Sequence, residues 1–221
     1  TTIGNALRRV MLSSLPGSAV TSVKIAGVMH EFQKIDGVKE DVTTIILNLK
    51  SLVLINHSTD TNKVIRLVAN EEGPVTAGQI TADADIEIVN PDLVICNLCK
   101  GGKIDMEMTV GNGRGYVDSK ANEKLLGEKK VGVIAIDSLY SPIERVSYEV
   151  EPARVGQNEN YDKLVMHVYT NGSVTPEEAM ALSAKILIEH FNIIANLNEI
   201  SDATGIMAEK KVDQITKTLE T

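Results

Sequence analysis

The chain has 221 residues, of which 22 are Lys or Arg and 30 are Asp or Glu, so its formal net charge is −8. This length allows one large domain or two small ones with real apolar cores. The negative charge argues against sequence-independent DNA binding, which relies on Lys and Arg at phosphates, and against adhesion to anionic membranes. We therefore expect no direct DNA binding by this chain and no membrane contact, since no apolar run approaches the roughly 20 residues that span a bilayer.

The beginning of the chain and its cysteine content suggest where the protein works. The first residues do not show a basic region followed by an apolar stretch, and only two cysteines are present. Both features favour a reducing compartment, and we expect a cytoplasmic protein. The chain starts with Thr inside a helix-capping sequence, so we expect it to be a fragment of a longer product.

The first predicted element is an amphipathic helix that ends before Pro16-Gly17. Proline cannot continue a helix, because it lacks the backbone N–H and its ring clashes with the preceding turn. One face of the helix is apolar at the 3.6-residue period, and the other face is largely polar. The apolar face consists of Ile3, Leu7, Val10, Met11 and Leu15, and the opposite face of Asn5, Arg8, Arg9 and Leu12. We expect the first face to pack and the second to dock.

The middle of the chain predicts a sheet-rich module. A strand is expected over residues 20–28, and a short helix over residues 38–50 with Asp41 near its start. Short strands separated by Gly, Pro and Asn turns then recur at regular intervals, which is typical of antiparallel sheets. These strands are expected at residues 52–55, 64–69, 86–89, 93–98, 103–110 and 131–136.

The last third predicts two strands and a long helix. The strands are expected at residues 146–151 and 164–170, and Thr175-Pro176-Glu177-Glu178 is a strong helix start. The helix should run to Leu197 and carries two apolar stripes, so it must be covered on two sides. One stripe is Ala179, Leu182, Ile186, Ile193 and Leu197, and the other is Met180, Ala184, Leu187, Ile188, Phe191 and Ala195. One stripe would cover the chain's own sheet, and the other would meet a second copy of the chain.

The residues that could form a chemical site have simpler structural explanations. Cys96 and Cys99 lack the further ligands that zinc requires, and the four histidines (His30, His57, His167 and His190) stand apart. The segment Gly111-Asn112-Gly113-Arg114-Gly115 lacks the Lys-Ser/Thr ending of a phosphate loop, and a tight turn between strands explains it better. We therefore expect no catalytic residues, no metal site and no cofactor.

Several motifs resemble the alpha subunit of bacterial DNA-dependent RNA polymerase, in the same order along the chain. The most specific is Gly4-Asn5-Ala6-Leu7-Arg8-Arg9 followed by Leu12-Ser13-Ser14-Leu15-Pro16-Gly17. The others are Gly27-Val28-Met29-His30-Glu31-Phe32, Lys39-Glu40-Asp41-Val42, Ile46-Leu47-Asn48-Leu49-Lys50, Gly73-Pro74-Val75-Thr76-Ala77, Gly113-Arg114-Gly115-Tyr116-Val117, Tyr140-Ser141-Pro142-Ile143-Glu144-Arg145-Val146 and Asn171-Gly172-Ser173-Val174-Thr175-Pro176-Glu177-Glu178-Ala179. The resemblance spans residues 3 to about 197.

Pattern and resemblance together predict an α+β fold with a discontinuous α/β dimerisation subdomain, residues 1–16 and 138–200, and an inserted, mostly antiparallel β subdomain, residues 17–137. Residues 201–221 would begin a flexible linker to an absent C-terminal DNA-binding domain. The resemblance implies a non-catalytic scaffold of DNA-directed RNA polymerase, a nucleotidyltransferase complex. The chain would homodimerise and nucleate assembly of the two large catalytic subunits for transcription.

The resemblance also assigns roles to individual residues. Arg8, Arg9 and Leu12 match the contact with the first large subunit, and Lys50 and Ile136 match positions used toward the second. We expect the dimer interface to include Leu7, Val10, Met11, Ile186, Leu187, Phe191 and Ile194. Residues 122–130 depart from the family's better-known members in length and charge, so the resemblance does not extend to an activator contact there.

Two alternatives from other classes remain at this point. One is an autonomous cytosolic α+β enzyme that uses the glycine-rich segment for a phosphorylated ligand. The other is a generic homodimeric binding module. Retained nucleotide binding would favour the first, and dimerisation without capture of any large polymerase subunit would favour the second.

Overall fold

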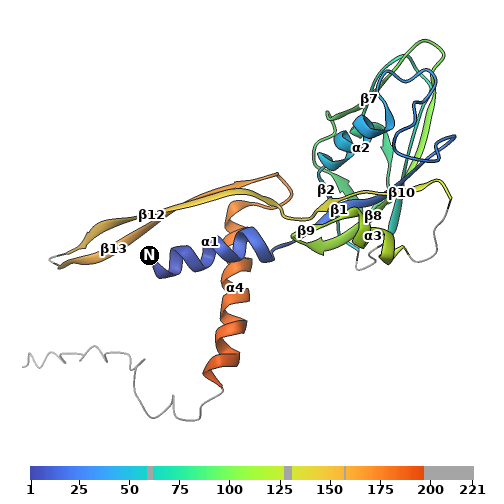
Figure 1. The fold of residues 1–221 in the computed structure, drawn as a ribbon. Helices are drawn as coiled ribbons and strands as arrows, with labels where there is room; N and C mark the ends of the chain where they lie inside the picture. The colour runs from blue at the N-terminus through green and yellow to red at the C-terminus, as the bar shows by residue number, and fades with distance from the viewer. Residues whose placement is uncertain (59–61, 127–130, 157, 197–221) are drawn as a thin grey trace, which may run out of the picture.

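The computed structural model describes residues 1–58, 62–126, 131–156 and 158–196. Its helices and antiparallel sheets confirm the predicted α+β class. Figure 1 shows a sheet-rich part, a long two-stranded hairpin that projects from it beside the first helix, and a last long helix that leaves in another direction. The helix and hairpin come from opposite ends of the chain, so the sheet-rich part is formed by the sequence between them.

A five-stranded antiparallel sheet is the main element of the sheet-rich part. Its strand order is β10 (Val133–Ala135), β1 (Pro16–Ile25), β8 (Ile104–Arg114), β3 (Lys63–Ala69) and β5 (Ile80–Thr81). Three small antiparallel pairs accompany it: β2 (Leu54–Asn56) with β6 (Ile86–Ile88), β4 (Gly73–Thr76) with β7 (Val94–Leu98), and β9 (Tyr116–Val117) with β11 (Ser138–Leu139). The helical elements of this part are α2 (Val42–Lys50), the short 3-10 helix η1 (Ala77–Gln79) and α3 (Ser119–Leu125).

The core of the sheet-rich part forms where one face of the sheet meets α2. Strand β3 alternates, with Ile65 and Leu67 buried and their neighbours exposed, because successive side chains of a strand point to opposite faces. From α2, Ile45 and Leu49 enter the same core at helical spacing. The buried residues of this core are therefore the ones expected from the two-residue period of a strand and the 3.6-residue period of a helix.

A second core lies between three elements from the ends of the chain. Helix α1 (Thr2–Ser14) packs on the hairpin formed by β12 (Ile143–Val155) and β13 (Asn158–Thr170), and also contacts α4 (Pro176–Ala195). The buried residues of this core are Leu7, Met11, Leu15, Ile143, Val146 and Ala179. Gly4 permits the close packing of α1 on the hairpin, because a Cβ there would lie only 2.7 Å from the ring of Tyr148.

The helix boundaries follow from their caps. Helix α2 begins at Val42 rather than at residue 38 as predicted, because the Asp41 carboxylate accepts a hydrogen bond from the backbone N–H of Thr44 and so caps the helix there. Helix α4 has the predicted capping box between Thr175 and Glu178, with Pro176 at its first position. It ends at Ala195, and the predicted end at residue 197 lies outside the described residues, as does the proposed linker.

The glycine-rich segment is not the turn predicted from its sequence. Residues 111–114 continue strand β8 and pair with residues 16–19 of β1. The chain turns only at Gly115, whose φ of +65° favours glycine. The hairpin strands extend well beyond the predicted 146–151 and 164–170, and the sequence did not predict α3, β4 or β5. The strands β4 and β5 depend on pairing with β7 and β3 rather than on a local pattern, whereas α3 is a short helix capped by the Asp118 carboxylate.

Tyr140 lies at the junction between the two cores. Its ring packs against Gly113, where an added Cβ would approach Cε2 to 2.7 Å, and its backbone lies against Gly17. The backbone N–H of Tyr140 also donates to the carbonyl of Gly115 at 2.8 Å. The chain therefore enters the sheet-rich part near Gly17 and leaves it near Tyr140 at adjacent points.

Candidate functional site

The two neighbouring arginines of α1 have different environments. Arg8 is half-buried, and its Nε donates a 3.2 Å hydrogen bond to the carbonyl of Val146 in β12. Arg9 is exposed and lines an open groove of about 500 Å³ together with Asn5, Val10 and Leu187. The guanidinium of Arg9 is thus available to a carboxylate on another molecule, whereas that of Arg8 also holds α1 on the hairpin.

Helix α4 exposes a large apolar surface. Ile186 and Leu187 are half-buried against the core that includes α1, whereas Phe191 and Ile194 farther along are 60% and 62% exposed. Leu182, Ile188 and Ile193 are exposed as well. Five such side chains on one helix are unusual, because each forgoes up to about 1.5–3 kcal/mol of burial free energy.

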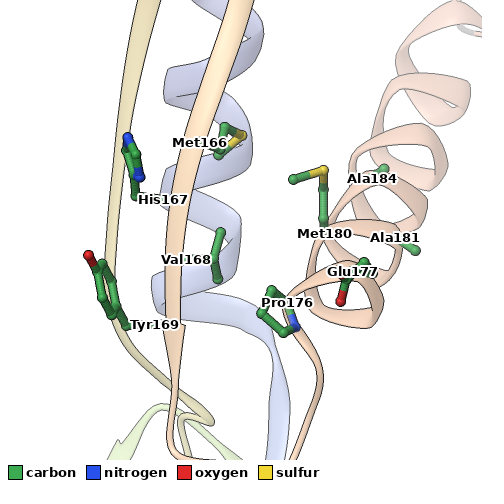
Figure 2. Close-up of a pocket in the computed structure, with 9 residues that line it drawn as sticks. All are labelled: Met166, His167, Val168, Tyr169, Pro176, Glu177, Met180, Ala181 and Ala184. Atoms are coloured by element: carbon green, nitrogen blue, oxygen red, sulfur yellow. The ribbon is translucent and has the colours of Figure 1, made fainter.

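A groove of about 770 Å³ separates α4 from β13 (Figure 2). Figure 2 shows Met166 and Val168 on the side of β13 toward α4, with Met180 extending from α4 to face them. His167 and Tyr169 point to the other side of the hairpin, where the Arg145 guanidinium lies 4.0 Å from the Tyr169 ring. The apolar surface of α4 therefore continues onto the hairpin.

Lys50 forms a polar cluster at the end of α2. Its Nζ lies 2.6 Å from Oδ2 of Asp137, and Oδ1 of Asp137 accepts from the backbone N–H of Ser119 at 2.9 Å. The ammonium of Lys50 and the Ser119 N–H hold the pKa of the Asp137 carboxyl below its usual value. Desolvation, and then the charge of Asp137, raise the pKa of the exposed Tyr116 hydroxyl. Tyr116 pairs across the β9–β11 ladder with Leu139, which is also exposed.

Residues 23–141 match the family described as the RNA polymerase Rpb3/RpoA insert domain. The chain is 56% identical over 219 residues to the DNA-directed RNA polymerase subunit alpha of Desulforamulus reducens, a match that covers 99% of this chain and 69% of that protein. The corresponding subunits of Carboxydothermus hydrogenoformans and Symbiobacterium thermophilum are 51% and 54% identical over the same shares of the two chains.

The chain belongs to the family of bacterial DNA-directed RNA polymerase alpha subunits. The resemblance predicted from the sequence motifs is thereby confirmed, and the reading as an autonomous enzyme or unrelated binding module is not favoured. Among the described residues, no helix is both long and apolar enough to span a membrane.

In this alpha-family chain, several predicted contact residues lie elsewhere than expected. Met11 is fully buried and Leu7 is nearly so, because α1 packs on the hairpin through Gly4, Leu7 and Met11. Both belong to the core of their own chain, where little or none of their surface is accessible to another molecule. Ile3, expected on the packing face, is instead 70% exposed.

Ile136 is likewise a core residue of the sheet-rich part, with 2% of its surface exposed. Its side chain therefore offers almost no surface to another molecule, and the accessible groups beside it are Lys50, Asp137 and Tyr116. Leu12 is half-buried against the core that includes Leu7. Val10 is half-buried and stays accessible at the groove beside Arg9.

The cysteines and histidines do not form a site in the described part of the chain. No group of three or more His, Cys, Asp or Glu side chains is close enough to hold a metal ion there. Cys96 is buried, and burial followed by the nearby charge of Glu40 raises the pKa of its thiol to about 12. Cys99 is exposed beyond the end of β7. Their accessibilities therefore differ sharply.

Asp137 is the functional candidate that the sequence did not reveal. It lies 87 residues from Lys50 along the chain and follows a short strand at the sheet edge. No local motif marks it, because only the pairing of β10 with β1 brings it to α2.

Proposed function

We propose that this chain homodimerises and then recruits the two large catalytic subunits of DNA-directed RNA polymerase, so that it acts as a non-catalytic scaffold. The single observation that carries the proposal is the apolar face of α4, where Phe191 and Ile194 are exposed although they suit a protein interior. A second copy placed on a two-fold axis would cover such a face on both chains at once. Val10 and Leu187, at the groove beside Arg9, extend the proposed interface.

The proposed division of the chain follows the two apolar cores. Residues 1–16 and 138–200 would form the dimerisation subdomain, and residues 17–137 the inserted subdomain. Their buried residues fall into two separate clusters, one between α1, the hairpin and α4, and the other around the five-stranded sheet. Tyr140 lies where the two clusters meet.

The proposed contact with the first large subunit uses the outer face of α1. Arg9 supplies an accessible guanidinium that can pair with a carboxylate through two hydrogen bonds. Arg8 and Leu12 are half-buried, so only part of each side chain is available to this surface.

The proposed contact with the second large subunit lies in the sheet-rich part around Lys50. The Lys50 side chain is about one-third exposed and keeps donor capacity beside Asp137. Within the complex, the chain would supply binding surface and symmetry and no catalytic group. We place its action in the cytoplasm and propose no direct DNA binding, in keeping with its net charge of −8.

Co-purification with separately expressed large subunits tests this function. The dimeric full-length subunit should capture the first large subunit alone, and the second only when the first is present. Capture of neither subunit by a folded dimer would refute the scaffold role. Monomeric behaviour at micromolar concentration would refute the assignment of α4 to a dimer interface.

A further inference from the structure

Strand β10 has an open edge. It is the last strand of the five-stranded sheet, and among the described strands its one partner is β1. The backbone N–H of Ile136 donates to the carbonyl of Thr21, which continues the ladder of these two strands. Backbone groups of successive residues in a strand point to opposite edges. The N–H and C=O groups of Ile134 therefore point to β1, and those of Val133 and Ala135 point away from it.

These outward groups have no partner within the part of the chain that the structure describes. The pairing of β1 with β8 agrees with this orientation. The N–H of Ala26 donates to the carbonyl of Asp105 in the segment that leads into β8, so the alternate residues of β1, among them Thr21 and Val23, face β10. The edge thus offers two N–H donors and two C=O acceptors in strand geometry. Just beyond the strand, the carbonyl of Ile136 accepts a 2.7 Å hydrogen bond from the Asn122 side chain, which places α3 at that end of β10.

A groove of about 490 Å³ accompanies this edge. It is lined by residues 131–135, by Met29 and its neighbours on one side, and by Leu126 and the polar side chains of α3 on the other. Met29 and Val131 are largely exposed. A strand edge next to apolar side chains is the arrangement that binds an extended peptide, since the backbone provides hydrogen bonds and the groove accepts alternate side chains.

From this geometry we infer that an extended segment of the second large polymerase subunit adds as a strand to the β10 edge, with its apolar side chains in the groove beside Met29 and Leu126. The inference rests on the proposed function. It explains how a contact at Ile136 is possible although that side chain is buried, because the neighbouring backbone rather than the side chain does the binding. The Lys50–Asp137 cluster directly follows this strand, so both would belong to one continuous surface.

The test removes one outward donor and leaves the sheet intact. Ala135→Pro deletes an N–H that does not bond to β1, and proline is tolerated on edge strands. Ala135→Val keeps the N–H and serves as the control. In the full-length dimer loaded with the first large subunit, we expect Ala135→Pro to weaken binding of the second about tenfold. Ala135→Val should bind as the wild type does.

A second pair of variants probes the groove without altering the strand. Met29→Asp changes an exposed groove residue, and Phe32→Asp changes an even more exposed apolar residue of the same loop outside the groove. We expect only Met29→Asp to weaken binding of the second subunit. Amide hydrogen exchange at Val133 and Ala135 should also slow when that subunit binds.

The outcomes separate the inference from the function on which it rests. If the wild-type chain captures neither large subunit, the proposed function fails and the inference fails with it. If capture proceeds normally, but both Met29→Asp and a folded Ala135→Pro variant bind the second subunit unchanged, or the two amides stay unprotected, the inference alone is wrong. If Ala135→Pro instead reduces self-association, the edge pairs with a second copy, which also overturns it.

Discussion

The Nε of Arg8 donates a hydrogen bond to the carbonyl oxygen of Val146, which ties α1 to β12 across 138 residues of sequence. Arg9 is adjacent to Arg8 but exposed at a groove beside α4. Two consecutive arginines therefore differ in what their removal should change: one supports the fold, and the other is free for a partner.

Replacing each arginine by alanine should separate these roles. Arg8→Ala should lower the free energy of unfolding by about 0.5–1.5 kcal/mol, because the Val146 carbonyl loses its side-chain donor. Arg9→Ala should leave unfolding unchanged and abolish capture of the first large subunit while the dimer persists. Urea titration and co-purification measure the two effects. Loss of the dimer in Arg9→Ala would mean that Arg9 belongs to the dimer interface of α1 and not to the face that binds the large subunit.

A charge on the exposed end of α4 should prevent dimerisation. Phe191→Glu should yield monomers, since a carboxylate at the centre of an apolar interface would lose its hydration without a partner. Asn192→Glu, at the adjacent exposed polar residue, is the matched control and should leave the dimer intact. Sedimentation equilibrium distinguishes the two. Phe191 is preferable to Ile186 or Leu187, because those half-buried residues also stabilise the monomer.

The Lys50–Asp137 pair predicts a particular pH dependence. The pKa of Asp137 is lowered in the folded chain below its ordinary 3.8, so its contribution to stability is present above about pH 4 and is lost as the pH falls through the lower, folded-state pKa. Lys50→Met removes the first cause of that shift. The variant should therefore be less stable than the wild type at pH 7, and the difference should shrink at pH 3. Urea unfolding at the two pH values checks this, and an equal difference at both would contradict it.

Gly113→Ala should destabilise the junction. The new Cβ would lie 2.7 Å from Cε2 of the buried Tyr140 ring, so either the ring or the strand must move, at a cost of about 1–3 kcal/mol. In a Tyr140→Ala background the same change should cost little, because the ring that it meets is absent. A double-mutant cycle in thermal unfolding measures this coupling. Additive effects of the two changes would show that the ring can move without cost.

The two cysteines should differ in reactivity. A thiol reagent at pH 8 should label exposed Cys99 in the native chain and spare Cys96, whose pKa of about 12 leaves almost no thiolate. Mass spectrometry after labelling reads the result, and unfolding in urea should make both react.

Chelators should leave the melting temperature unchanged. A marked decrease in melting temperature would indicate a bound metal and contradict the prediction that the cysteines form no metal site.

The long helices were predictable because their signals are local. The capping box at Thr175 and Glu178 and the stop at Pro16 lie within a few residues of the ends that they define. The packing face of α1 was predicted less well. Gly4 has no side chain to mark it as buried, yet its lack of a Cβ lets Tyr148 and Leu164 approach, and this turns the buried face away from Ile3.

The candidate contact surfaces were predictable only in part. Arg9 and the apolar end of α4 follow from helical periodicity and proved accessible. The burial of Ile136 and the partnership of Lys50 with Asp137 depend on which strands become neighbours and in which register. A one-residue shift in that register would turn Ile136 outward, so no local sequence pattern determines it.

The closeness of Gly17 and Tyr140 has a practical consequence for engineering this subunit. Since the polypeptide crosses into and out of the inserted region at neighbouring points, that region could be exchanged between homologues as a cassette with two splice sites. A chimera that keeps Gly17, Gly113 and Tyr140 should preserve both splice sites. Recruitment specificity for one large subunit could then be transplanted while the other stays that of the host.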